Sequence, residues 1–320
     1  MKYAFIRRNR NVWPIRIQCR VLKVSVAGYH GHFARQLRVA ERRHLSEEAL
    51  GVHVRAVYQE QRGAYGWPRV WRELRAQGIR VGKQRVQRLM QCQGLRARGK
   101  KRFRPATTDS RHSMPIAPNR LDRQFLVNVP NRVWVGDITY IGTEEGWLYL
   151  AVVIDLFSRR IVGWSLRSEI RTEIVTKALE MAWYRRRPEP KEELMFHSDR
   201  GSQYASDEFR RTLSRFDIVP SMSRTGNCWD NACAETLFGS LKVERLAGRC
   251  FATRREAADE ALEWIHWYNN RRMHSTLKYL SPVQFEKDWW NSELRHGYGK
   301  VEKQKPFSNF PTATTTTAGL

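Results

Sequence analysis

Apolar positions in the first third of the chain recur every three to four residues, which is the spacing of amphipathic helices. The pattern of residues 14–36 predicts two short helices, with a break between them near Ser25. The apolar face of this pair is assigned to Ile17, Val21, Leu22 and Val24. Residues 33–62 predict one longer, basic helix. We therefore assign residues 1–63 to a basic helical N-terminal region.

The next segment, residues 64–97, predicts two helices joined by a turn at Gly78. Pro68 suits the first turn of the first helix, and Gly94 suits the end of the second. The inward apolar positions are Val70, Trp71, Leu74, Val86, Leu89 and Met90. Three basic residues are predicted on the outer face of the second helix, namely Lys83, Arg85 and Arg88. The pattern is typical of a DNA-binding helix-turn-helix, although an ordinary helical hairpin with a solvated basic face also fits.

Residues 98–126 lack periodicity and are rich in Arg, Ser, Thr and Pro, which predicts a basic linker extended along DNA. From residue 131 the pattern changes to short runs of β-branched and aromatic residues that alternate with helical segments. The expected order is three antiparallel strands, a helix, a strand, a helix, a strand and a long helix. This order predicts a mixed α/β domain, which we assign to residues 127–246.

Beyond that domain, residues 254–270 predict an amphipathic helix within a C-terminal helical extension at residues 247–290. The remaining segment, residues 291–320, ends in PTATTTTAGL and is expected to be disordered.

Charge is distributed very unevenly along the chain. Its 320 residues include 57 Lys and Arg against 32 Asp and Glu, a net charge of +25. Residues 1–130 contain 29 of these basic residues and only 7 of the acidic ones. Such a segment repels itself unless a polyanion neutralises it, and double-stranded DNA does so with release of counterions. A solvated basic face is the alternative interpretation.

Two other classes of protein are disfavoured by the sequence. It has no apolar run near 18 residues and its N-terminus lacks the pattern of a signal peptide, so we expect no membrane association. The five cysteines are odd in number and include no C-x-x-C pair, which argues against a disulfide framework or a zinc ribbon. A reducing cytoplasm is the expected location.

Three acidic residues carry the candidate chemistry. Asp137 lies in the middle of the first strand, Asp199 follows the apolar run of a later strand, and Glu235 lies on the long helix. Phosphoryl transfer on DNA requires charge to be neutralised on several oxygens, and divalent ions held by carboxylates can do this. Each acid alone also fits a strand-end, turn or solvated helix residue. Lys242 follows Glu235 by seven residues, two turns along the same helix face, where it could meet DNA.

Several stretches together identify a family. They include YGWPRVWRELRAQGI, VWVGDITYI, HSDRGSQYAS and SMSRTGNCWDNACAETLFGSLKVE. From about residue 14 to 290 the chain resembles the second-frame proteins of the insertion-sequence-three family of bacterial transposases, which have a retroviral-integrase-like core. The resemblance implies a ribonuclease-H-like fold, in which a mixed five-stranded sheet is flanked by helices. It also implies an Asp-Asp-Glu triad at Asp137, Asp199 and Glu235.

The resemblance further implies two Mg²⁺ ions, for which Mn²⁺ can substitute, and double-stranded DNA as the partner, both as element ends and as target. Since two ends must be paired, a homo-oligomer on DNA is expected. Proteins of this family are usually joined to an upstream-frame product that supplies a helix-turn-helix and a leucine zipper. This chain shows no clear heptad run, so a fusion or a partnership with such a product is also expected.

Further DNA contacts are assigned to residues around the triad, namely Arg200, Gln203, Tyr204, Arg224, Trp229 and Asn231. Tyr204 could instead simply pack, and Asn231 could cap the helix that carries Glu235. Trp229 could stack on a base or act as a surface anchor. Asp155 is left out of the metal site because Arg159 or Arg160 is expected to pair with it.

The preferred hypothesis is an endonuclease and strand transferase that moves an insertion sequence. One alternative is a ribonuclease-H-like nuclease without transfer activity. The other is a DNA-binding regulator without catalytic activity, which would use only the basic N-terminal region.

Overall fold

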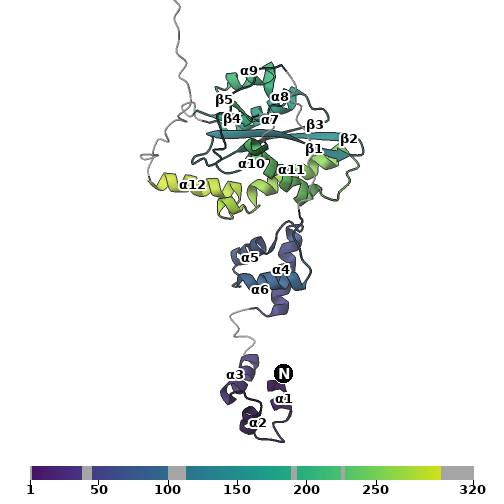
Figure 1. Cartoon of the computed structure of the whole chain (residues 1–320), viewed down its shortest axis with the longest axis vertical. Coiled ribbons are helices and arrows are strands. Elements are labelled where there is room, and N and C mark those ends of the chain that lie inside the picture. Colours follow the sequence, from purple (N-terminus) through teal and green to yellow (C-terminus); the bar gives the residue numbers. More distant parts are fainter. Residues whose placement is uncertain (1, 38–44, 100–112, 189–192, 225–227, 297–320) are drawn as a thin grey trace, which may run out of the picture. The chain divides into compact units, whose positions relative to one another are not determined.

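The computed structural model describes residues 2–37, 45–99, 113–188, 193–224 and 228–296 (Figure 1). The chain divides into two compact units, Met1–Arg96 and Ala97–Leu320. Among the described residues, no helix has both the length and the apolar character needed to cross a membrane.

The first three helices are α1 (Lys2–Arg8), α2 (Ile15–Val21) and α3 (Val26–Leu37). They share a small core of Ile6, Cys19 and Tyr29. The break between α2 and α3 confirms the two helices predicted around Ser25. The predicted apolar face is wrong at two positions, because Ile17 is 43% exposed and Val21 is 71% exposed. Gln18 and Cys19 are buried in their place, so the inward face of α2 is rotated from the predicted one.

A second group of helices follows, α4 (Glu47–Glu60), α5 (Trp67–Ala76) and α6 (Lys83–Cys92), and these three pack against one another. The single helix predicted over residues 33–62 is wrong, since α3 ends at Leu37 and α4 begins after Ser46. The Ser46 hydroxyl accepts a hydrogen bond from the backbone N–H of Ala49, which is an N-terminal cap. The turns that end α5 and α6 place Gly78 and Gly94 at φ values of 82° and 67°, a conformation that glycine adopts without strain.

The second unit is built on a five-stranded mixed sheet. Its strands are β1 (Val133–Thr143), β2 (Gly146–Asp155), β3 (Ile161–Arg167), β4 (Met195–Ser198) and β5 (Val219–Met222). Their spatial order is β3-β2-β1-β4-β5. The first three strands pair antiparallel, whereas β4 pairs parallel to β1 and β5 parallel to β4. This arrangement confirms the predicted mixed α/β fold.

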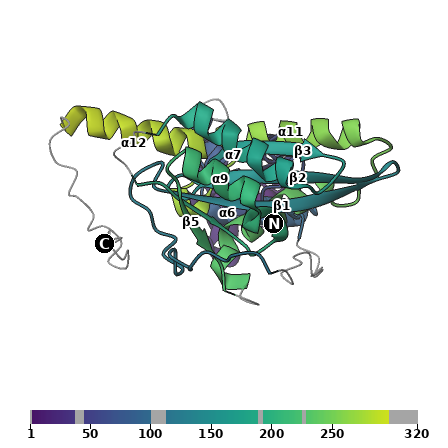
Figure 2. The ribbon, with the colours of Figure 1, turned by 90° about the horizontal axis from the view of Figure 1, so that it is seen from above.

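Helices cover both faces of this sheet (Figures 1 and 2). One face carries α7 (Thr172–Arg186), α8 (Ser202–Ala205) and α9 (Asp207–Arg215). The other face carries α10 (Ala232–Leu241), the π-helical turn η3 (Lys242–Leu246) and α11 (Arg254–Asn270). Two short 3-10 turns also occur, η2 (Cys228–Asn231) and η4 (Ser275–Leu277). The side chain of Asn269, on α11, exchanges two hydrogen bonds of 2.9 Å with the backbone of Ile161 on β3.

The last helix, α12 (Pro282–His296), continues six residues into the segment expected to be disordered, whose remainder lies outside the described residues. A cluster of charged side chains holds α12 against the sheet. Glu286 accepts hydrogen bonds from Ser158, Arg160 and Arg186. Arg186 also pairs with Asp155 at 3.2 Å, so the partner predicted for Asp155 among Arg159 and Arg160 is wrong. Burial raises the pKa of Asp155 to about 6, against the opposing charge of Arg186.

The predicted linker does not extend freely over its described part, residues 113–126. Leu121 is fully buried. The backbone N–H groups of Arg120 and Leu121 both donate to the hydroxyl of Ser221 on β5, at 2.9 and 3.2 Å. Residues 113–126 therefore form part of the second unit and are not a free linker, whereas their contact with DNA stays a prediction.

Close approach between sheet and helix makes Gly163 sensitive to substitution. A Cβ atom at Gly163 would lie 2.1 Å from the carbonyl oxygen of Ala178 on α7. We expect Gly163→Ala to lower the free energy of unfolding by about 2 kcal/mol or more, because backbone cannot yield as a flexible side chain does. Urea unfolding of the full chain measures this. Gly142→Ala, on β1, is the control, since its Cβ would meet only the Trp147 ring at 3.5 Å. Equal stability of the two variants would contradict the packing argument.

Candidate active site

The pairing of β1 with β4 brings two of the predicted acids to one place. These parallel strands pair Val133 with Met195 and Val135 with His197. Asp137 and Asp199 each lie two residues beyond the last of these pairs. Side chains alternate along a strand, and Trp134 and Phe196 point into the core beneath α7 and α9. Asp137 and Asp199 therefore point to the opposite face of the sheet.

The third acid comes from the helix on that same face. Glu235 is exposed in the first turn of α10, and α10 packs on β1. The pKa of Asp137 is raised well above its ordinary value, first by burial and then by the negative charges of Asp199 and Glu235. The N–H of Ile138 and the charge of Lys242 oppose this rise. Asp199 and Glu235 thus both lie close enough to Asp137 to repel its carboxylate, which is the electrostatic environment that a cation would relieve.

Backbone donors orient the two aspartates. Oδ1 of Asp137 accepts from the N–H of Ile138 at 2.8 Å, and Oδ1 of Asp199 accepts from the N–H of Gly201 at 3.0 Å. A Cβ at Gly201 would lie 3.1 Å from that same Asp199 oxygen. A glycine next to Asp199 therefore lets the loop after β4 fold back tightly against the carboxylate.

Tyr204 lies behind the acids instead of on the surface. Its side chain is 2% exposed and packs against Phe196 and Phe209. Burial, followed by the charges of Asp137 and Asp199, raises its pKa well above 10. The predicted DNA contact of Tyr204 is wrong in this structure, because the core around it leaves the ring no access to a ligand. Packing, the alternative interpretation, is what the structure shows.

Lys242 lies beside the acids, but it is on a π-helical turn and not on the continuous α-helix that was predicted. The α-helical hydrogen bonding of α10 ends at Leu241, and Lys242 begins the π-helical turn η3. Its ammonium group lies 4.9 Å from the centre of the Tyr140 ring. Burial lowers the pKa of Lys242, while the charge of Asp137 raises it. The lysine thus supplies a cation next to Asp137, and its contact with DNA stays a prediction.

A buried carboxylate fixes the start of the helix that carries Glu235. Asp230 is 1% exposed and accepts hydrogen bonds from Asn119, Arg123 and Arg224. Both the N–H and the side chain of Arg224 donate to it, each at 3.0 Å. These donors, above all the Arg224 side chain, hold the pKa of Asp230 well below its usual range. Asp230 therefore ties residues 119–123 and the end of β5 to the first turn of α10.

The other end of α10 is held by a second buried ion pair. Glu244, on η3, is 5% exposed and accepts from Arg272 at 2.7 Å and from the Trp264 indole at 3.2 Å. Arg272 also donates to the hydroxyl of Ser240, at 3.1 Å, in the last turns of α10. Glu235 and Lys242 are thus carried on a helical segment whose two ends are both fixed by buried charges.

Of these fixing residues, only Arg224 was singled out from the sequence, as a DNA contact, and the structure instead shows it bound to Asp230. The partners of Asp230 lie up to 111 residues away along the chain, and no local spacing connects them. His197 is also fully buried, with its Nδ1 atom 2.9 Å from the Ser221 hydroxyl. Burial lowers the pKa of His197 to about 4, so this histidine is neutral at pH 7.

The other residues assigned to DNA contacts have partners within the protein or are buried. Arg200 donates to the backbone oxygen of Ser223 at 2.6 Å, and Gln203 is half-buried. Asn231 is 7% exposed, and its side chain makes no capping hydrogen bond, so the predicted cap is wrong. The side chain of Trp229 lies outside the described residues.

On α6, the three predicted DNA contacts differ in their surroundings. Lys83 is exposed and lies 5.0 Å from the centre of the Trp71 ring. Arg85 and Arg88 both bind the carboxylate of Glu47, at 2.6 and 2.9 Å. Glu47 thus offsets part of the positive charge on this face of α6.

Comparison with protein families assigns most of the chain. Residues 127–228 and 235–297 match two family models that are both described as "Integrase core domain". Residues 45–103 match a family described as "HTH-like domain". The two integrase matches cover the sheet, all three acids, most of α10, and α11 and α12, and the third match covers α4–α6.

Solved structures similar to this chain include a simian T-cell lymphotropic virus intasome in complex with a PP2A regulatory subunit, 19% identical with a TM-score of 0.41. That match covers 64% of this chain and 67% of the other. The catalytic core domain of BIV integrase is 16% identical with a TM-score of 0.39, over 51% of this chain and 97% of the other.

Similar sequences give a closer relationship. Transposase InsF for insertion sequence IS3A, from Escherichia coli strain K12, is 40% identical over 288 residues, which are 89% of this chain and 98% of that protein. The insertion element IS600 31 kDa protein of Shigella sonnei is 40% identical over 272 residues, 85% of this chain and 98% of that protein. These matches confirm the resemblance found in the sequence, and the chain belongs to the IS3 family of insertion-sequence transposases, with an integrase core domain preceded by an HTH-like domain.

Proposed function

We propose that this transposase cuts DNA at the ends of an insertion sequence and joins those ends to target DNA, with Asp137, Asp199 and Glu235 as its catalytic residues. The observation that carries the proposal is the convergence of three acids from β1, the loop after β4 and α10 on one face of the sheet. Acids from distant parts of the chain repel one another there, at a cost to stability that a binding site explains.

The donor set fits a hard divalent cation. All three side chains offer carboxylate oxygens, which Mg²⁺ prefers, and Mn²⁺ accepts the same ligands. Asp137 and Asp199 would hold two ions between them, and Glu235 would complete one of the sites. Within the described residues, no three His, Cys, Asp or Glu side chains are already grouped to hold an ion. We therefore propose that Asp137 and Asp199 would hold the ions and that Glu235 would join them as a further ligand when the ions are bound.

In the reaction, a water molecule or a DNA 3′-hydroxyl forms a new P–O bond as the bond to the leaving 3′-oxygen breaks. When bound, the metal ions would neutralise charge on the attacking, leaving and non-bridging oxygens. The chain's own residues orient the ligands: the N–H groups of Ile138 and Gly201 fix the two aspartates. Lys242 adds a positive charge beside Asp137 that favours an approaching phosphate. No covalent bond between protein and DNA is required.

Further parts of the proposal concern partners. The HTH-like and integrase domains indicate a protein that acts on double-stranded DNA. Because an insertion sequence has two ends that must be brought together, we propose a homo-oligomer on DNA, with or without the upstream-frame protein. The location we propose is the bacterial cytoplasm, at the nucleoid.

Replacing Asp199 by Asn tests the catalytic assignment. We expect strand transfer to fall by at least about a thousandfold, because a ligand charge is lost, while DNA affinity stays within about twofold. The measurement uses duplexes with the terminal inverted repeats that flank the encoding frame, in both uncut and pre-cleaved form. Asp217→Asn, an exposed position away from the sheet face, is the matched control.

Three outcomes decide between the candidate functions. Transfer by Asp199→Asn at the parent rate would refute the assignment of the acids. Cleavage without joining of pre-cleaved ends by the parent chain would favour a simple nuclease. Mg²⁺-independent binding with neither reaction would favour a DNA-binding regulator.

Replacing Asp137 by Asn tests the electrostatic basis of the metal site. The folded pKa of Asp137 lies above its unfolded value of 3.8, so its ionisation destabilises the fold as the pH rises from about 4 through the folded pKa. Asp137→Asn should therefore raise the free energy of unfolding of the metal-free chain at pH 8 by about 1 kcal/mol or more. The gain should shrink toward zero as the pH approaches 4.

Chemical unfolding in EDTA at several pH values measures this effect. Addition of Mg²⁺ should raise the melting temperature of the parent and leave that of Asp137→Asn nearly unchanged. A destabilised Asp137→Asn variant, or an equal response of both proteins to Mg²⁺, would contradict a repulsive metal site.

A further inference from the structure

The first helical segment, residues 2–37, has an unusual charge composition. We call it the N-terminal module. It contains no Asp or Glu. Its eight basic residues are Lys2, Arg7, Arg8, Arg10, Arg16, Arg20, Lys23 and Arg35. The HTH-like family match begins only at residue 45, so it does not include this module. Without internal acids, its positive charge must be balanced by solvent ions or by an external polyanion.

The element order and the turn length of the module match those of a helix-turn-helix. Helices α2 and α3 pack together and are joined by four residues, 22–25. A turn of three or four residues between two such helices is typical of this motif, often with a glycine. Here Lys23 takes the left-handed conformation, with φ of 52°. The Ser25 hydroxyl then accepts from the N–H of Gly28 at 2.9 Å, which caps the start of α3.

Helix α1 completes the module and fixes the angle of α3. A Cβ at Gly28 would lie 2.7 Å from the hydroxyl of Tyr3, so glycine at this position allows α1 to lie directly against α3. Ile6 from α1, Cys19 from α2 and Tyr29 from α3 form the buried centre. The small core therefore holds three helices in a defined arrangement.

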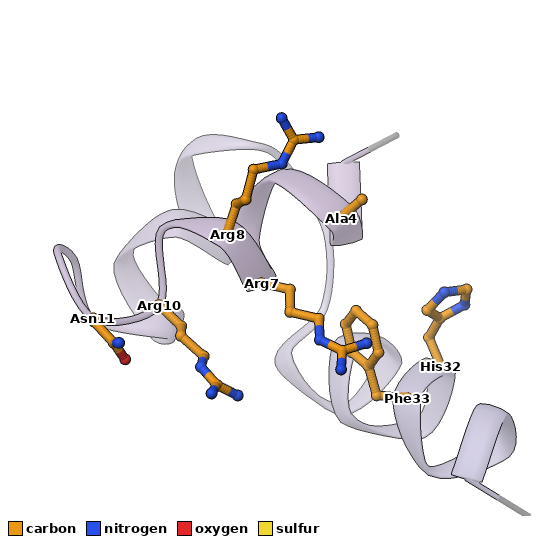
Figure 3. Close-up of a pocket in the computed structure, with 7 residues that line it drawn as sticks. All are labelled: Ala4, Arg7, Arg8, Arg10, Asn11, His32 and Phe33. Carbon is orange, nitrogen blue, oxygen red and sulfur yellow. The ribbon is translucent and has the colours of Figure 1, made fainter.

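A basic hollow lies between α1 and α3 (Figure 3). Its volume is about 610 Å³, and its lining is Ala4, Arg7, Arg8, Arg10, Asn11, His32 and Phe33. The Arg7 guanidinium lies over the Phe33 ring, 4.8 Å from its centre, as the close-up shows. All three arginines are exposed. Three exposed guanidinium groups around one hollow, with an amide beside them, suit the oxygens of successive phosphodiesters.

The start of α3 presents a surface suited to a groove of DNA. Val26 is 37% exposed, and Ala27 and His30 are also exposed. A Cβ at Gly31 would meet no atom within 4 Å. Small residues allow a helix to approach base edges closely, Val26 offers an apolar contact for a thymine methyl, and His30 offers a hydrogen bond.

Comparison with α6 favours the N-terminal module as a strong site for phosphate. On α6, Arg85 and Arg88 already share the Glu47 carboxylate. The N-terminal module has no carboxylate to compete with a phosphate for its arginines. Internal ion pairs therefore reduce the electrostatic attraction of the N-terminal module to DNA less than they reduce that of α6.

We propose that residues 2–37 form a second helix-turn-helix, separate from the HTH-like domain, and that they bind double-stranded DNA. Helix α3 enters the major groove, and the hollow lined by Arg7, Arg8 and Arg10 takes the phosphate backbone. This assignment rests on the chain acting on DNA, but it does not depend on the catalytic triad.

The test compares two variants of the full chain that each lose three positive charges. One is Arg7→Gln/Arg8→Gln/Arg10→Gln. The control is Arg171→Gln/Arg210→Gln/Arg255→Gln, in which every arginine already faces a carboxylate, of Glu169, Asp207 and Asp259 respectively. Fluorescence anisotropy measures binding to a labelled random-sequence duplex DNA of about 40 base pairs at several salt concentrations. EDTA is present throughout, so a failure of the catalytic proposal does not affect the result.

We expect the module variant to bind DNA at least about tenfold more weakly than the parent chain. The slope of log K against log salt should also become less steep, by about 1 to 3. The control should change both quantities much less. Circular dichroism melting of both variants should match the parent, because all six arginines are on the surface.

Other results would overturn the proposal. Equal losses in the two variants would mean that only net charge matters. Unchanged DNA binding together with a smaller oligomer in light scattering would show that the module binds a second copy of the chain. Equally tight binding of an RNA duplex of the same length, lost equally in the module variant, would exclude entry of α3 into a major groove, because the RNA groove is too narrow.

Discussion

Repulsion of the Asp137 carboxylate by the nearby charges of Asp199 and Glu235 is the interaction on which our account of the second unit depends. Parallel pairing of β1 with β4 forces the two aspartates to the same level on the same face of the sheet. Burial and neighbouring negative charge then raise the pKa of Asp137. The unfolded chain has no such repulsion, so the rest of the fold must supply the free energy that keeps these groups together.

Buried polar networks around the site supply part of that restraint. Asp230 holds the start of α10 through Arg224, Asn119 and Arg123. The pair of Glu244 and Arg272 holds its other end. Each network joins segments that are remote in sequence, and each is satisfied by several hydrogen bonds. Such networks specify one arrangement, because loss of any partner leaves a buried charge uncompensated.

The N-terminal helices that we propose to contact nucleic acid form two groups of different electrostatic character. In α4–α6, Glu47 pairs with the arginines of α6 and moderates their charge. In α1–α3, no acid is present, and the arginines around the hollow project into solvent. A chain that must both find DNA and position it gains from one strongly and one moderately basic group, since phosphate contacts set affinity and orientation.

The sequence by itself determined the order of strands and helices in the second unit and the helix of residues 254–270, because local periodicity is a property of consecutive residues. It also named the three candidate acids, through motifs that are local in the same way. Only the tertiary structure decided that Tyr204 is buried, that Asp155 pairs with Arg186, and that residues 113–126 pack against the second unit. Each of these three contacts depends on which side chains from a distant segment lie next to the residue. The polar partner of a residue is set by how distant segments pack in three dimensions, and the local spacing of residues does not reveal that packing.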